Sequence, residues 1–171
     1  MKLLSILFIV TLVSITNAKE QKSHREHGAH AHGAGSLGIA FEGPNGRIDF
    51  KMPSESIVGF EYVAKSAKDK SKRDTAILTL EKNISEMVVF DATLNCKFNK
   101  EKIEIIAESE KHSSLVAGFN VMCLRSPVGT EIIFNFQKQF PKIKDLDVEV
   151  VADSVQKSVE ATKDNTRLFL K

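Results

Sequence analysis

The chain has 171 residues, of which 24 are basic and 22 are acidic, so its formal charge at pH 7 is +2. A nearly neutral chain lacks the electrostatic footprint with which proteins bind nucleic acid or an anionic membrane surface. Its length suits one folded domain, which can bury most of its apolar side chains.

Residues 1–18 are expected to be a signal peptide. Lys2 supplies a basic start, residues 3–13 form an apolar run, and Thr16, Asn17 and Ala18 give the small-residue pattern that a signal peptidase cuts after. A retained membrane helix would need about 20 apolar residues, which this run does not reach. We therefore expect export, cleavage after Ala18, and a mature chain that does not span a membrane.

Residues 19–33 form a polar arm that carries four of the five histidines of the chain: His24, His27, His30 and His32. Imidazole is the commonest neutral metal ligand and suits zinc, copper and nickel. The alternative is a disordered, solvated tail. Ordering residues 24–32 costs on the order of 9–18 kcal/mol, whereas a structural zinc site returns about 10–16 kcal/mol. Tight binding by this arm therefore requires a further ligand from the folded domain.

Residues 34–171 are expected to form a single β-rich domain, because several segments alternate with the two-residue period of a half-buried strand. The first two segments are SLGIAFEG and RIDFKM, and the GPNG between them predicts a hairpin turn. The later alternating segments are KIEIIA, SLVAGFNVMC, DLDVEVV and RLFL.

Between Lys65 and Val88 the apolar period changes to three or four residues, which predicts one long amphipathic helix. A shorter helical turn is expected at NFQKQFP, ended by Pro141. The predicted fold is α+β, with a mainly antiparallel sheet in a sandwich-like core and the long helix packed against it.

The two cysteines, Cys96 and Cys123, lie in phase with the buried positions of their segments. In an exported chain, such an even pair is most simply a disulfide. Closing this loop would stabilise the fold by about 3.6 kcal/mol according to the chain-entropy model. The alternative is a redox or metal-binding pair, which is disfavoured because neither cysteine belongs to a CxxC motif.

His112 is the only histidine outside the arm, and it is the best candidate for a ligand anchored in the folded domain. Glu61, in IVGFEY, is a candidate carboxylate ligand, or a partner that fixes the tautomer of a histidine ligand.

Several segments together resemble the family of periplasmic zinc-uptake proteins called ZrgA. They are HREHGAHAHGAGSLGIAF, ESIVGFEY, Cys96, HSSLVAGFNVMC, QFPKIKDLDVEVV and the closing RLFL. The resemblance implies a periplasmic zinc-binding protein of a Gram-negative bacterium that helps to supply an uptake system in the inner membrane. It also implies that the motif histidines are His24, His27, His30 and His32, with His112 as the later histidine before the second cysteine.

The chain differs from many members of that family at three places. The segment before the second cysteine is the short ESEKHSS, where relatives carry a long loop rich in His and Asp. Ser114 and Val116 stand where relatives often show an acidic residue and a second histidine, and Tyr62 stands where many have His. These differences argue against a capacity for several zinc ions.

The leading hypothesis is a monomeric periplasmic protein that captures Zn²⁺ through the arm histidines and passes it to an inner-membrane transporter. Zinc is preferred to Cu(I) because residues 19–33 contain neither Cys nor Met. The alternatives are a Cu(II) or Ni(II) binding protein and a metal-free, disulfide-stapled structural or interaction module. We do not expect an enzyme, because the chain has no HExxH motif and no nucleophile elbow.

Overall fold

The computed structural model of the protein describes residues 32–171. The expected signal peptide and the arm histidines His24, His27 and His30 lie outside the described residues. Within residues 32–171, none of the helices has the length and apolar character needed to cross a membrane.

Residues 32–171 form two sheets, and the larger one has six strands in the order β4-β5-β2-β1-β7-β8. The bounds are β1 Ala34–Glu42, β2 Asn45–Pro53, β4 Lys97–Ala107, β5 Ser113–Met122, β7 Asp145–Ala152 and β8 Val155–Glu160. The predicted β1–β2 hairpin is present, and Gly43 between its strands adopts a φ of 54°, a conformation that favours glycine. All neighbouring strands are antiparallel except β1 and β7, which pair in parallel from Ala34 opposite Asp145.

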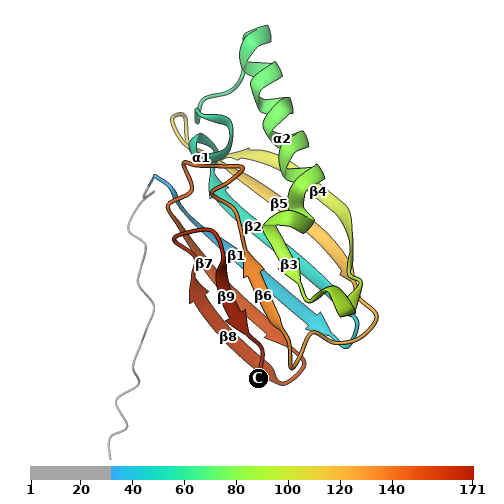
Figure 1. The fold of residues 1–171 in the computed structure, drawn as a ribbon. Coiled ribbons are helices and arrows are strands. Elements are labelled where there is room, and N and C mark those ends of the chain that lie inside the picture. The colour runs from blue at the N-terminus through green and yellow to red at the C-terminus, as the bar shows by residue number, and fades with distance from the viewer. Residues whose placement is uncertain (1–31) are drawn as a thin grey trace, which may run out of the picture.

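The smaller sheet has three short strands in the order β3-β6-β9. Their bounds are β3 Val88–Phe90, β6 Glu131–Phe134 and β9 Thr166–Phe169, and the helices are α1 Ser54–Val58, α2 Ala67–Met87 and the 3₁₀ turn η1 Ala92–Leu94. In Figure 1, the smaller sheet and α2 lie over the same face of the larger sheet.

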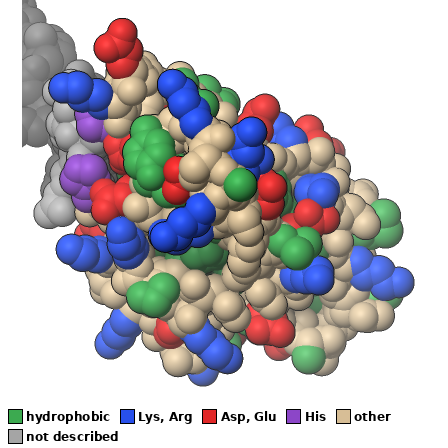
Figure 2. Space-filling model, turned by 90° about the horizontal axis from the view of Figure 1, so that it is seen from above, with side chains coloured by type: hydrophobic (Ala, Val, Ile, Leu, Met, Phe, Trp, Pro, Cys, Tyr) green, Lys and Arg blue, Asp and Glu red, His purple; other side chains and the backbone are tan. Residues whose placement is uncertain are grey.

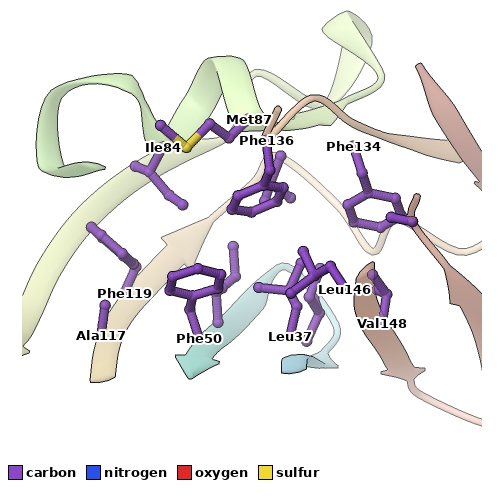
Figure 3. Close-up of a cluster of buried hydrophobic side chains, with 14 of the residues drawn as sticks. Leu37, Phe50, Ile84, Met87, Ala117, Phe119, Phe134, Phe136, Leu146 and Val148 are labelled. Carbon is purple, nitrogen blue, oxygen red and sulfur yellow. The ribbon is translucent and has the colours of Figure 1, made fainter. Parts of the chain in front are cut away.

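The core lies between these layers. Figure 3 shows Leu37 and Phe50 of the larger sheet opposite Met87 of α2 and Phe136, which follows β6. The rings of Phe50 and Phe136 stack with their centroids 5.4 Å apart. The other face of the larger sheet is mostly exposed, since buried and exposed residues alternate along β1, β2 and β7.

The predicted α+β class with mainly antiparallel strands is confirmed, but its finer description is not. The second layer is only a three-stranded sheet beside a helix, so a sandwich-like core is not established. Helix α2 buries Ala76, Leu80, Ile84 and Met87, and none of its residues before Ala76 is buried. The first nine residues of the helix are exposed or half-buried, so an amphipathic character along its whole length is not confirmed. The predicted turn at NFQKQFP is a single turn, in which Phe140 N donates to Phe136 O.

The disulfide between Cys96 and Cys123 is confirmed. Strands β4 and β5 pair from Lys97 opposite Met122, so the two cysteines lie one step beyond the end of this ladder. The bridge therefore closes one end of the β4–β5 hairpin, and the hairpin turn at the other end carries His112.

Candidate metal centre

The residues that meet at the end of the larger sheet come from four segments that are distant in sequence. Helix α1 follows β2 at once and places Glu55 in its first turn. Gly59 ends the helix with a φ of 92°, in the left-handed region that favours glycine, and its N–H donates to Glu55 O at 3.0 Å. This tight ending turns the chain back so that Glu61 follows close to Glu55.

His32 faces both carboxylates. Its Nδ1 lies 2.8 Å from Glu55 Oε2 and 3.8 Å from Glu61 Oε1. One ligand atom from each of His32, Glu55 and Glu61 lies within 4.8 Å of the other two. The side chain of Glu61 is 9% exposed and that of His32 is 63% exposed, so Glu61 lies on the protein side of the group and His32 on the solvent side.

The second oxygen of Glu61 contacts His112. The distance from His112 Nδ1 to Glu61 Oε2 is 2.6 Å, and Ser113 Oγ donates to the backbone oxygen of Glu61 at 2.6 Å. The β4–β5 turn holds His112 in place, because the N–H groups of Glu108 and Ser109 both donate to His112 O. Glu61 is thus anchored through its side chain and its backbone.

Gly33 holds the chain that leads into β1. The N–H groups of Lys144 and Asp145 donate to Gly33 O at 2.9 and 3.1 Å. Gly33 has a φ of 91°, and a Cβ at this position would lie 2.9 Å from Lys142 O. Only glycine fits this close approach, which places His32 next to α1.

Glu55 has a further partner in Lys142, whose Nζ lies 3.1 Å from Glu55 Oε1. The hydrogen bond and positive charge of Lys142, with a smaller contribution from His32, lower the pKa of Glu55 below its ordinary value. Figure 2 shows histidine and acidic side chains together at this end of the molecule, with basic side chains around them.

The donor set fits a zinc ion. Imidazole nitrogen and carboxylate oxygen are both zinc ligands, and ligand atoms in a tetrahedral zinc site lie about 3.3 Å apart. The distances from His32 Nδ1 to Glu55 and Glu61, 2.8 and 3.8 Å, lie on either side of that value. A cation that replaces the hydrogen bond between His32 and Glu55 would therefore need only small side-chain adjustments. His112 acts on this group through Glu61.

Of the residues predicted from sequence, His32, His112 and Glu61 are brought together here, whereas His24, His27 and His30 lie outside the described residues. Glu55 and Lys142 were not predicted. Glu55 lies in the same ESIVGFEY segment as Glu61, but no spacing rule indicates that a five-residue helix and a left-handed glycine bring both carboxylates to one histidine. Lys142 reaches Glu55 from 87 positions away.

Residues 29–170 match the model of a family described as the ZrgA family zinc uptake protein. The matched range includes both cysteines and His30, His32, Glu55, Glu61 and His112, whereas His24 and His27 precede it. No curated protein showed significant similarity to the chain.

Proposed function

Because this chain belongs to the ZrgA family of zinc uptake proteins, we propose that it binds Zn²⁺ at the centre formed by His32, Glu55 and Glu61. The observation that carries the proposal is the convergence of these three side chains, whose ligand atoms all lie within 4.8 Å of one another. In this role Zn²⁺ is cargo, which the protein binds and then releases.

His112 has the role of a supporting partner in this proposal. Its Nδ1 contacts the oxygen of Glu61 that faces away from His32, so it orients the carboxylate. A hydrogen-bonding partner of this kind fixes the direction of a ligand and tunes its basicity.

The arm histidines His24, His27 and His30 supply the remaining coordination in our proposal. His30 is only two positions from His32, whose backbone neighbour Gly33 is bound to the segment before β7. The arm does not have to form a site alone, because the folded domain contributes two carboxylates. Ligands from the folded domain add to the free energy of zinc binding, which can then offset the cost of ordering the polar arm.

We further propose that the protein works in the periplasm and passes zinc to an uptake system in the inner membrane. The leader-like residues 1–18 and the family description support export and a role in zinc uptake. The proposed role is binding and delivery by a monomer, without catalysis.

The test is a zinc titration by calorimetry on the chain that begins at Lys19, with elemental analysis of the purified protein. Wild type is expected to bind zinc and to unfold at a higher temperature when saturated, because a ligand that binds only the folded state stabilises it. His32→Ala should lose most of this affinity, and the triple variant His24→Ala, His27→Ala, His30→Ala should bind about 10- to 100-fold more weakly.

Absence of zinc binding by wild type would overturn the proposed function and favour a metal-free module. Equal affinity of wild type and the triple variant would remove the arm from the site. A parallel titration with Cu(II) is informative because most N/O sites bind Cu(II) more tightly than zinc in vitro. Zinc recovered from cells, rather than affinity alone, therefore identifies the cargo.

Zinc affinity is expected to fall as the pH is lowered through about 6.5. An imidazole ligates only when neutral, and its unperturbed pKa is about 6.5, so protons compete with the metal below that pH. Titrations at pH 7.5, 6.5 and 5.5 should show progressively weaker binding. Constant affinity across this range would contradict imidazole ligation and leave carboxylates as the only ligands.

A further inference from the structure

Both oxygens of the Glu55 carboxylate are occupied. Oε2 lies 2.8 Å from His32 Nδ1, and Oε1 lies 3.1 Å from the ammonium nitrogen of Lys142. A metal ion at His32 and Glu55 therefore shares this carboxylate with a positive charge. As long as Lys142 keeps its contact, Glu55 offers the metal one oxygen instead of two.

The position of Lys142 is tied to the position of His32. Lys144 and Asp145, which follow Lys142 closely, donate their backbone N–H groups to Gly33 O at 2.9 and 3.1 Å. The segment that binds the backbone next to His32 is thus also the segment that carries the ammonium group of Lys142. The ammonium nitrogen lies 3.1 Å from the carboxylate that would bind a cation beside His32.

A positive charge at this place has two effects on a bound divalent cation. It repels the ion, and it neutralises part of the carboxylate charge that attracts the ion. Both effects act through only a few ångströms, where screening by salt is incomplete. An acidic or neutral residue here would make a tighter site, so Lys142 opposes the binding for which the other three side chains are suited.

We propose that Lys142 is a counter-cation that weakens Zn²⁺ binding and speeds its release. This inference rests on the proposed function, and it concerns the regulation of the same centre. A protein that delivers its cargo has to lose the ion as well as capture it. Among close variants of one site, affinity differences act mainly on the dissociation rate.

A purely structural role for Lys142 makes the opposite prediction. If the ion pair served only to position Glu55, removing it would loosen a ligand and weaken zinc binding. Lys142→Gln keeps a hydrogen-bond donor without the charge, and Lys142→Met removes both, so the two variants separate charge from positioning. Lys157→Gln is the matched control, because it makes the same charge change at an exposed lysine of β8 that is paired with Val150, away from the end of the sheet that carries the centre.

The experiment measures zinc affinity by competition with a chromophoric chelator and zinc release by stopped flow into excess chelator, at pH 7.5. Carboxylates with ordinary pKa values near 4.3 are ionised there, so only charge and geometry change. Lys142→Gln and Lys142→Met are expected to bind zinc about three- to tenfold more tightly and to release it correspondingly more slowly. Lys157→Gln should stay within about twofold of wild type.

The gain in Lys142→Gln should shrink in 1 M NaCl, where the Debye length is about 3 Å. Unchanged or weaker binding in both Lys142 variants would overturn the inference, as would an equal gain in Lys157→Gln or a gain that is independent of salt. The proposed function is judged separately by wild type. If wild type binds zinc and only the Lys142 variants behave otherwise than expected, the inference alone fails.

Discussion

Replacing Glu61 with glutamine is expected to weaken zinc binding about 100-fold. Glu61 is the most buried member of the centre, and its two oxygens face His32 Nδ1 and His112 Nδ1. Glutamine has the same shape but no charge, and its amide group must point an N–H₂ toward one of the two imidazoles. The change therefore removes an anionic ligand and disturbs the orientation of a second group. Calorimetric titration with zinc measures the loss.

Glu42→Gln is the matched control, because Glu42 is an exposed glutamate at the opposite end of β1. It should leave zinc affinity unchanged. Both variants should unfold within a few degrees of wild type without zinc, which shows that the fold is retained. If Glu61→Gln bound zinc as tightly as Glu42→Gln, the centre described here would not be the zinc site.

Removing the disulfide is expected to lower the free energy of unfolding by about 3.6 kcal/mol. The bridge joins Cys96 to Cys123 and closes a loop of about 28 residues, so its loss releases chain entropy in the unfolded state. The double variant Cys96→Ala, Cys123→Ala avoids a free thiol. Urea unfolding of the double variant and of oxidised wild type gives the difference directly.

Reduced wild type provides the control, because it keeps both side chains and loses only the cross-link. It should match the double variant within about 1 kcal/mol, since the remaining difference is the packing of two small side chains. Zinc affinity should change much less than stability, because the bridge lies at the far end of the β4–β5 hairpin from His112. A double variant as stable as oxidised wild type would contradict the stabilising role of the bridge.

The strands with one buried face were predictable because their side chains alternate. Leu37, Ile39 and Phe41 in β1, and Ile48, Phe50 and Met52 in β2, are buried as the period of two indicates. Strand β8 was not predicted, since it is an edge strand with four of its six residues exposed and two half-buried. Strands β3 and β6 span only three and four residues, too few to show a period.

The parallel pairing of β1 with β7 could not be predicted from the alternation of apolar residues. The alternation indicates which face of a strand is buried, but it does not indicate its neighbour or its direction. The parallel pairing brings the start of β7 beside the start of β1, and the backbone bonds to Gly33 follow from it. In this way the topology of the sheet determines where His32 lies.

The sequence by itself was sufficient for the α+β class and the disulfide, and it indicated His32, His112 and Glu61 as candidate site residues. These follow from local spacing and from the chemistry of single side chains. Only the tertiary structure showed that Glu55 and Lys142 belong to the same centre, because their positions depend on a short helix, a left-handed glycine and a contact across 87 positions. Metal ligands must converge within a few ångströms, and such convergence is a property of the folded chain rather than of its order of residues.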